Sequence, residues 1–212
     1  MADQKINLSA IKIGLLGDSS VGKTAICNAL MNVEFAEDML STIGSDKLET
    51  KFTLKNGNTI KLVLWDTAGQ ERFRSVALSA LKAAQGVVVV FDVTKKLTFQ
   101  NVDNWLQEIK DNLTNPNLVL FGNKADLNDR EVTENEAKKY AKKNNLEYFE
   151  TSAKTKQGLN EGFSYFINDI YDKAVANNNN NDDDKNKNKI DLKKKNKETK
   201  EKTGCFGKKK KK

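Results

Sequence analysis

The sequence has few of the residues that would crosslink it, interrupt it or carry it through a membrane. Its two cysteines, Cys27 and Cys205, lie far apart, which favours a reducing compartment and excludes a disulfide framework. A single proline leaves few built-in breaks. No apolar run approaches the roughly 18 residues that a membrane-spanning helix needs. Residues 1–10 lack the basic start and apolar stretch of a signal peptide, so we expect a cytoplasmic protein.

The basic excess of the chain is confined to its last part. Residues 177–212 hold 14 Lys against 6 Asp and Glu, a balance of +8, whereas the whole chain carries +7. Residues 1–176 are therefore nearly neutral, at −1. The last part is also rich in Asn and has no apolar periodicity, so it cannot bury a core. We predict a folded domain over residues 1–176 and a disordered tail over residues 177–212 with a polybasic end.

Strand-like and helix-like segments alternate through the first 176 residues. The turn at residues 56–58 (NGN) joins two strand-like runs and is typical of a hairpin. The rest of the pattern predicts an α/β fold: a mixed, mostly parallel six-stranded sheet with helices on both faces, and ligands at the carboxyl ends of its strands. We expect strands near residues 11–17, 48–54, 59–65, 86–92, 118–122 and 147–150, and helices near residues 21–31, 99–113, from 133 onward with Thr133 as N-cap, and 159–175.

A phosphate-loop motif follows the first predicted strand. Residues 17–24 read GDSSVGKT, the complete G-x-x-x-x-G-K-[ST] pattern, whose glycines let backbone N–H groups point at phosphate oxygens. Lys23 would reach the β- and γ-phosphates, and the Thr24 hydroxyl would bind Mg²⁺. A chance glycine turn is disfavoured because the motif ends a strand and opens a helix. We expect the phosphates of the bound nucleotide to contact Gly17, Asp18, Ser19, Ser20, Val21, Gly22, Lys23, Thr24 and Ala25.

A second motif, DTAGQE over residues 66–71, lies at the end of the third predicted strand. Asp66 could hold the metal through water, and the Gly69 amide could meet the γ-phosphate. Gln70 could orient the attacking water as the catalytic residue. Taken alone, D-x-x-G could equally be a polar turn after a strand.

Two further loops can recognise the base. The sequence NKAD at residues 123–126 supplies Asp126, which can accept from the N1–H and 2-amino groups of guanine, a pair of donors that adenine lacks. The sequence TSAK at residues 151–154 supplies the Ala153 N–H for guanine O6. Either tetrapeptide alone is a common loop, but in this order, each after a strand, they predict guanine. The expected base contacts are Asn123, Lys124, Asp126, Ser152, Ala153 and Lys154, with the two lysine stems on the base faces.

Together with Phe35 and Thr42, these loops resemble those of the Ras superfamily of small GTPases over about residues 8–175. The resemblance implies a single three-layer P-loop NTPase domain, the G domain. It also implies that Phe35 lies edge-on to the base and that Thr42, in switch I, senses the γ-phosphate and joins Thr24 and Asp66 at the metal. Without the resemblance, Phe35 would be interpreted as a core aromatic residue.

Within the superfamily the chain is most similar to Rab. The similarity lies in residues 41–46 (STIGSD), 61–65 (KLVLW), 71–75 (ERFRS), 90–94 (VFDVT) and 98–102 (TFQNV) with Trp105. Lys47 stands where Rabs usually have Phe, and residues 80–83 (ALKA) replace a usual Tyr-Tyr-Arg-Gly run, so that of an aromatic trio only Trp65 remains. We expect Lys47 to redirect partner choice. The expected effector region is Met39, Leu40, Ser41, Thr42, Ile43, Gly44, Ser45, Asp46 and Lys47.

The resemblance implies a GTP-binding, slowly GTP-hydrolysing molecular switch with Mg²⁺, a Rab-like regulator of vesicle and membrane trafficking. It implies an exchange factor, a GTPase-activating protein that inserts an arginine, and effectors that distinguish the GTP and GDP forms. The alternative is a GTP-binding scaffold with negligible turnover, against which the intact Gln70 argues.

The tail leaves three possibilities open. Its lysines could bind an anionic membrane surface, at about 1 kcal/mol per Lys, Cys205 could carry a palmitoyl or irregular prenyl group, or the tail could be an inert spacer. Cys205 precedes Phe-Gly and five lysines, which matches neither the usual Rab ending nor a C-a-a-X box. We expect reversible association with the cytosolic face of a membrane. Nucleic-acid binding is not expected, because residues 1–176 have no basic excess and Phe206 is the only aromatic residue near the basic run.

Overall fold

The computed structural model describes residues 10–36, 42, 44–67, 78–79 and 81–177. The described residues from 10 to 171 form one compact unit, and the fold below is that of this unit. Residues 172–177 are helical and belong to a second unit. The predicted boundary between a folded domain and a tail at residue 177 stays a prediction, because residues 178–212 lie outside the described part of the chain.

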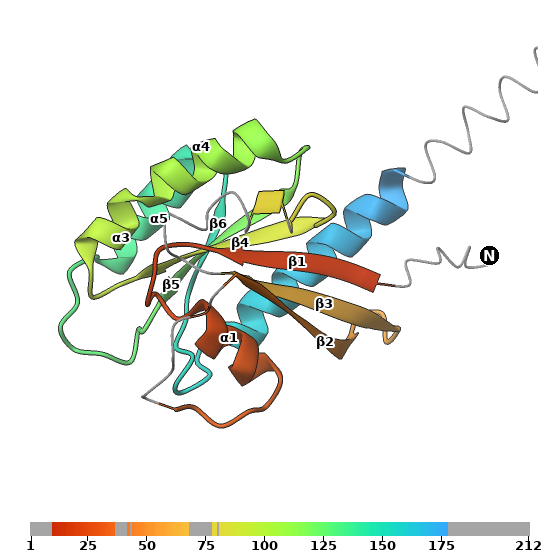
Figure 1. Ribbon diagram of the computed structural model, residues 1–212, viewed down its shortest axis with the longest axis horizontal. Coiled ribbons are helices and arrows are strands. Elements are labelled where there is room, and N and C mark those ends of the chain that lie inside the picture. The colour runs from red at the N-terminus through yellow and green to blue at the C-terminus, as the bar shows by residue number, and fades with distance from the viewer. Residues whose placement is uncertain (1–9, 37–41, 43, 68–77, 80, 178–212) are drawn as a thin grey trace, which may run out of the picture. The chain divides into compact units, whose positions relative to one another are not determined.

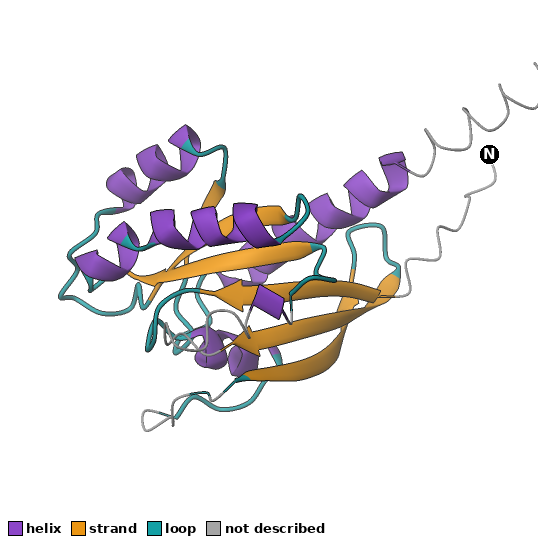
Figure 2. Ribbon diagram, turned by 45° about the horizontal axis from the view of Figure 1, so that its top comes forward, coloured by secondary structure: helices purple, strands orange, loops and turns teal. Residues whose placement is uncertain are grey.

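A six-stranded sheet forms the centre of the unit (Figures 1 and 2). Its strand order is β2-β3-β1-β4-β5-β6, and every neighbouring pair is parallel except β2 with β3. The predicted mixed, mostly parallel sheet is therefore confirmed. The strands are β1 (Ala10–Leu16), β2 (Ser45–Thr53), β3 (Thr59–Thr67), β4 (Gly86–Asp92), β5 (Asn117–Asn123) and β6 (Glu147–Glu150).

The antiparallel pair is the predicted hairpin. Gly57 has a φ of 82°, which suits glycine in a tight turn. The Leu54 N–H donates to the Asn58 carbonyl at 2.8 Å, and the Asn58 N–H donates to the Asn56 side chain at 3.0 Å. The Asn and Gly residues that indicated a hairpin therefore make its turn.

Apolar side chains cover both faces of the sheet. The four valines of β4 alternate: Val88 and Val90 belong to one buried cluster, Val87 and Val89 to the other. All four are at most 1% exposed, as expected for a strand with helices on both sides. Burial of an aliphatic or aromatic side chain of this kind contributes roughly 1.5–3 kcal/mol. Because both faces of β4 are buried, the end of this strand is held in place, and the predicted site lies at such strand ends.

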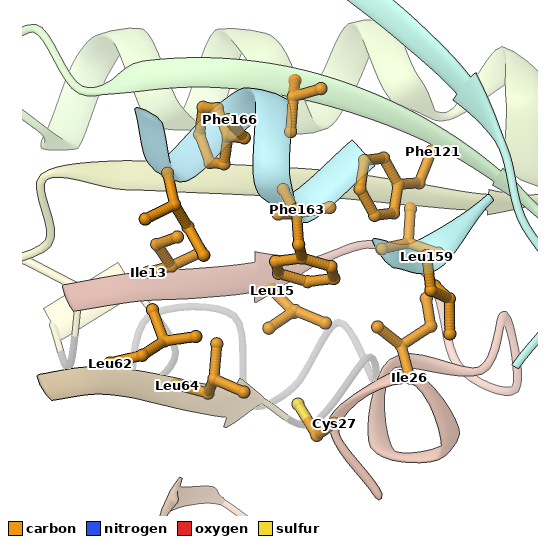
Figure 3. Packing of buried hydrophobic residues seen from close by; sticks show 14 of the residues in the cluster. Ile13, Leu15, Ile26, Cys27, Leu62, Leu64, Phe121, Leu159, Phe163 and Phe166 are labelled. Atoms are coloured by element: carbon orange, nitrogen blue, oxygen red, sulfur yellow. The ribbon is translucent and has the colours of Figure 1, made fainter. Parts of the chain in front are cut away.

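Each cluster is completed by helices. On one face, Leu159, Phe163 and Phe166 of the final helix, residues 159–177, pack over the apolar side chains of β1 and β3, and Ile26 comes from α1 (Figure 3). On the other face, Trp105 of α4 and Ala137 of α5 belong to the second buried cluster, where α4 contacts β4 and α5 contacts β6. The labelled helices are α1 (Lys23–Leu30), α3 (Lys96–Gln100), α4 (Val102–Asn112) and α5 (Glu134–Lys143).

One predicted helix is wrong in its extent. The pattern over residues 99–113 predicts one helix, but the structure has α3 and α4 separated at Asn101, whose side chain donates to Asp18. The buried side chains of α4 are Val102, Trp105 and Ile109. The N-cap of α5 is also confirmed, because the Thr133 hydroxyl accepts from the Glu136 N–H at 3.2 Å. The Glu136 side chain contacts Lys96.

Among the residues that the structure describes, no helix has the length and apolar character to span a bilayer.

Candidate nucleotide site

The predicted motifs gather at one edge of the sheet. The phosphate loop follows β1, Asp66 lies near the end of β3, Asn123 ends β5, and Thr151 follows β6. These strands are parallel, so their carboxyl ends meet at the same edge, which is where open α/β sheets bind ligands. The order of the strands brings together loops that are more than 120 residues apart in the sequence.

The path of the phosphate loop depends on two glycines. Gly17 has a φ of 147°, and a Cβ there would lie 2.1 Å from the Val90 carbonyl oxygen. Gly22 has a φ of 99°, and a Cβ there would lie 2.3 Å from Asn123 Nδ2. A side chain at either position would force the loop away from its neighbours. Along the motif Gly17, Val21, Lys23 and Ala25 are buried, Asp18, Gly22 and Thr24 are half-buried, and Ser19 and Ser20 are exposed.

Lys23 is folded back over this loop. Its ammonium group donates to the Gly17 carbonyl at 2.9 Å and to the Asp18 carbonyl at 2.8 Å, and only 5% of the residue is exposed. Desolvation lowers the pKa of Lys23 from 10.5 to about 8, although the charges of Asp66 and Asp18 oppose this. A buried ammonium group with no full counter-charge is well prepared to bind an anion.

Three oxygen-bearing side chains converge beside Lys23. The Thr24 hydroxyl donates to Asp66 Oδ2 at 2.7 Å and lies 2.7 Å from the Thr42 hydroxyl, which is 3.3 Å from the same carboxylate oxygen. Burial raises the pKa of Asp66, against the opposing effect of the Thr24 hydrogen bond. The other oxygen, Asp66 Oδ1, is buried without a hydrogen-bond partner among the described residues.

This donor set fits Mg²⁺. Hydroxyl and carboxylate oxygens are the ligands that Mg²⁺ prefers, and the orphaned Asp66 Oδ1 has unused acceptor capacity. In the described part of the chain, no three His, Cys, Asp or Glu side chains form a metal cage. Mg²⁺ in phosphate sites usually takes one or two carboxylates and completes its shell with phosphate oxygens and water. The residues present therefore suit a metal that is shared with a phosphate ligand.

Asn123 ties three loops together. Its Nδ2 donates to the Val21 carbonyl of the phosphate loop at 2.9 Å. Its Oδ1 accepts from the Ala153 N–H at 3.1 Å and from the Thr151 hydroxyl at 3.3 Å. The Ala153 N–H, predicted to meet guanine O6, is thus paired within the protein in this structure. The buried Asn123 side chain thus connects the loops that form the site, whereas the sequence alone predicted only a contact with the base.

Asp126 is oriented by the loop opposite. The Ser152 hydroxyl donates to Asp126 Oδ1 at 2.6 Å and accepts from the Thr155 N–H at 3.0 Å. This chain fixes one carboxylate oxygen of Asp126 against the 151–155 loop. The half-buried carboxylate is thereby held in a single orientation, as the recognition of a base edge requires.

An exposed aromatic ring lies at the margin of these loops. Phe35 is 42% exposed, and the Lys154 ammonium group lies 5.8 Å from the centroid of its ring. The Lys156 ammonium group also donates to the Asn32 side chain at 3.1 Å, so the segment before switch I contacts the 151–158 loop at two points. The structure thus places Phe35 outside both core clusters and beside the predicted base loops.

Asp18 raises a physical question, because a carboxylate in a phosphate loop should repel phosphate. The structure shows that its oxygens are turned toward α4 and the residue before it. Trp105 Nε1 donates to Oδ1 at 2.8 Å, and Asn101 Nδ2 donates to Oδ2 at 2.7 Å. Each oxygen is therefore compensated by a separate donor, and the loop is anchored to the helical layer. Sequence reasoning assigned Asp18 to GTP and missed both Asn101 and Trp105 as partners.

We expect Asp18→Ala to destabilise the nucleotide-free protein by about 1–3 kcal/mol, because the buried Trp105 indole and the Asn101 amide lose the acceptor that they share. For a domain of this size each kcal/mol lowers Tm by about 2–4 °C. Thermal unfolding measured by circular dichroism checks this. Asn112→Ala, at an exposed position of α4, is the control, and equal Tm values for the two variants would contradict the anchor.

Lys124 has a partner that the sequence did not indicate. Its ammonium group lies 2.6 Å from Asp92 Oδ2, at the end of β4. Asp92 is fully buried and stands 32 positions before Lys124, in a segment that was interpreted only as strand. A signal was present, because a charged residue that ends an all-apolar strand is unusual unless it is paired.

Part of the predicted site lies outside the described residues. This applies to Met39, Leu40, Ser41 and Ile43 of the effector region, to Gly69 and Gln70, and to Cys205. Within the described part of the effector region, Lys47 lies directly opposite Trp65 in the β2–β3 pair, and its ammonium group is 2.6 Å from Glu49. Hydrogen bonds from Lys47 and Lys61 lower the pKa of Glu49 to about 2. Lys47 thus places a charged cluster next to Trp65.

Comparison with known proteins gives a consistent result. A family model described as "Ras family" matches residues 12–172. The chain is 41% identical over 165 residues to Ras-related protein Rab-18-B of Danio rerio, covering 77% of this chain and 80% of that protein. It is 42% identical over 168 residues to Ras-related protein Rab-1A of Dictyostelium discoideum, covering 78% and 83%. It is 38% identical over 170 residues to Ras-related protein Rab-18 of Caenorhabditis elegans, covering 79% and 83%.

Proposed function

Because this chain belongs to the Ras family and, within it, to the Rab small GTPases, we propose that the loops described above are its guanine-nucleotide site. The protein is a GTP-binding switch that hydrolyses GTP and a Rab-like regulator of membrane trafficking. One observation carries the residue assignments: Lys23, Thr24, Thr42 and Asp66 converge at the same sheet edge as Asp126 and Ser152. A phosphate-binding group and a base-reading group are thus held at the edge of one sheet.

The phosphates are bound by preorganised charge. Lys23 already lies over the phosphate loop, and because burial lowers its pKa, the charge of a nearby anion would stabilise its protonated form. The Asp18 carboxylate is paired with Asn101 and Trp105, which partly compensates its charge beside the phosphates. Thr24, Thr42 and Asp66 would hold Mg²⁺, which when bound would neutralise charge on the β- and γ-phosphate oxygens.

The base is recognised by the carboxylate of Asp126, fixed by Ser152. Guanine presents two adjacent donors, N1–H and the 2-amino group, to such a carboxylate, and adenine does not. The stems of Lys124 and Lys154 contact the faces of the base, and Phe35 lies at its edge. The Asn123 amide keeps the three loops at the spacing that the nucleotide needs.

Hydrolysis is assigned to a water that Gln70 orients. Gln70→Leu is expected to slow GTP hydrolysis by about a hundredfold in the presence of the cognate activating protein, because the attacking water loses its positioning group. Phosphate release in single-turnover assays checks this, with Gln100→Leu, at an exposed position, as the control. Turnover equal to wild type would contradict the role of Gln70. A wild-type protein that binds GTP but shows no turnover even with its activator would support the scaffold alternative.

Switching follows from the same contacts. Thr42 contacts Thr24 and Asp66 at the metal site, so loss of the γ-phosphate would weaken the hold on the segment around residues 39–47. Exchange factors, activating proteins and effectors would contact this segment and residues 68–82. The charged cluster of Lys47, Glu49 and Lys61 beside Trp65 supports a partner choice different from that of Rabs with an aromatic trio.

The tail would bring the switch to a membrane. Its five terminal lysines would be attracted to anionic lipid on the cytosolic face of a membrane, and Cys205 would offer a site for a lipid group. Reversible binding of this kind suits a protein that alternates between two nucleotide states. Intact-mass measurement of the protein from its native cell would show whether Cys205 is modified.

Nucleotide content is the direct test of the proposed site. The purified protein is expected to contain GDP or GTP, released on denaturation and identified by chromatography. Calorimetry of the stripped protein with GDP and Mg²⁺ should give tight binding, and ADP should give none. Protein that is isolated empty and shows no heat with GDP would overturn the proposal.

A further inference from the structure

A buried carboxylate lies beside the base loop and has no role in the nucleotide contacts above. Asp92 is the last residue of β4 and is fully buried. In the parallel pairing of β4 with β5 it stands opposite Asn123, the residue directly before Lys124. A charge in such surroundings is strongly disfavoured unless hydrogen bonds or an opposite charge compensate it. The partners of Asp92 therefore indicate its role.

The two carboxylate oxygens of Asp92 have different partners. Oδ1 accepts from the Thr94 N–H at 2.9 Å and from the Thr94 hydroxyl at 2.7 Å. Oδ2 has no hydrogen-bond partner among the described residues, and the Lys124 ammonium group faces it at 2.6 Å. The backbone is fixed as well, because the Asp92 N–H donates to the Thr98 hydroxyl at 3.0 Å. Thr94 and Thr98 thus aim Oδ2, and Lys124 provides the compensating charge.

Lys124 is constrained at both ends. Its backbone has a φ of 67°, in the left-handed region that non-glycine residues rarely adopt. Its side chain is 29% exposed, although lysine side chains are usually well solvated and sample many rotamers. The loop fixes the Cα end of the stem and Asp92 fixes the ammonium end. The four-carbon stem between them is held in one place, next to the residues assigned to the base.

We propose that Asp92 is a positioning residue for the guanine nucleotide, which holds the Lys124 stem in the place where the base stacks. This inference rests on the proposed function, because it takes the 123–126 loop as the base site. Asp92 acts through Lys124. A stem that is ordered before the nucleotide arrives does not have to lose conformational freedom on binding, so the nucleotide is held more tightly and released more slowly.

The test compares release of a fluorescent GDP analogue, chased with excess GTP, from wild type and Asp92→Asn. The substitution keeps the shape of the side chain and an acceptor for Thr94 but removes the charge that holds Lys124. We expect release about tenfold faster, which corresponds to about 1.4 kcal/mol. Asn168→Ala is the control for lost stability, because Asn168 is buried and its partners are Lys55 and Ser164. It should lower Tm without changing the release rate.

A double-mutant cycle shows whether Asp92 acts through Lys124. Lys124→Met keeps a similar stem without the charge and should also accelerate release. In the Lys124→Met background, Asp92→Asn should change the rate by less than about twofold. Should Asp92→Asn fail to fold, Thr94→Val takes its place, since it removes one donor that aims the carboxylate and should accelerate release only when Lys124 is present.

Three results would overturn the inference. The first is release from Asp92→Asn at the wild-type rate, and the second is a double variant whose acceleration equals the product of those of Asp92→Asn and Lys124→Met. The third is an acceleration by Asn168→Ala equal to that of Asp92→Asn. In each of these the wild-type protein still holds GDP, and the proposed function stands. A wild-type protein that does not bind GDP overturns the proposed function and this inference with it.

Discussion

Lys23→Met is expected to weaken nucleotide binding by at least about a hundredfold while it stabilises the nucleotide-free protein. The ammonium group is buried over the phosphate loop and would be the principal positive charge that faces the phosphates. Loss of one partner from a buried charge pair costs about 3–5 kcal/mol. We therefore expect affinity for GDP and GTP to fall by about a hundredfold to a few thousandfold. Calorimetry of the stripped variant with GDP and Mg²⁺ is the measurement.

The expected gain in stability of the nucleotide-free variant has the same cause, the burial of the Lys23 ammonium group. A fall in the Lys23 pKa from 10.5 to about 8 means that the empty pocket disfavours the charged side chain, by about 3 kcal/mol at neutral pH. Methionine carries no charge to desolvate, although it gives up the two hydrogen bonds to the loop carbonyls. The net expectation is a gain of about 1–2 kcal/mol for the nucleotide-free variant. Function is thus maintained here at the expense of stability.

The pH dependence of the unfolding free energy distinguishes the desolvation of Lys23 from better packing of the methionine side chain. Between about pH 8 and 10.5 the unfolded chain holds the Lys23 proton and the folded protein does not, so the stability of nucleotide-free wild type rises across this window. Below pH 8 both states are protonated and the full penalty is present. Lys23→Met should lack this contribution, so the difference in unfolding free energy between the two proteins should shrink as the pH rises. Lys138→Met, at an exposed position of α5, should show no such trend, and a difference that stays constant with pH would contradict the explanation.

The sequence could predict those elements and loops whose structure is determined by residues close to one another in the chain. The valine run of β4, the Asn-Gly-Asn hairpin turn and the Thr133 N-cap each have their physical cause within a few residues, and each is confirmed. The phosphate loop is equally local, since a glycine pattern after a strand determines a backbone path. Because the strands are parallel, the loops at their carboxyl ends then had to meet at one edge.

The contacts that could not be predicted join residues distant in the sequence. Asp18 meets Trp105 across 87 positions, and Asp92 meets Lys124 across 32. No local sequence pattern indicates such pairs, because aspartate residues also occur in solvated turns and their neighbours in the sequence do not distinguish the two cases. The break at Asn101 belongs to this class, since its side chain bonds to the phosphate loop. Asn123 was expected at the base, but its amide is largely occupied by two other loops, a role that only their arrangement in space reveals.

Asp126→Asn is expected to change the preferred base from guanine to xanthine. The Ser152 hydroxyl donates to Asp126 Oδ1, so an asparagine would keep its carbonyl oxygen there and place its NH₂ at the Oδ2 position. An NH₂ group would then face the 2-amino group of guanine, donor against donor. Xanthine carries a carbonyl oxygen at the same position and would accept the hydrogen bond. A site built for particular donors typically rejects a mismatched analogue by several powers of ten, and we expect GTP affinity to fall by at least about a hundredfold.

Competition of GTP and XTP against a fluorescent GDP or XDP analogue measures this exchange of preference, with Asp129→Asn, the same chemical change at an exposed position, as the control. The serine gives the decisive comparison. In Ser152→Ala the asparagine amide is no longer held in the orientation that matches xanthine, so Ser152→Ala together with Asp126→Asn should bind XTP less tightly, and discriminate less between the two bases, than Asp126→Asn alone. Equal discrimination by the two would show that the carboxylate is oriented by something other than the 2.6 Å bond from Ser152. Retained preference for GTP in Asp126→Asn itself would place base recognition elsewhere in the site.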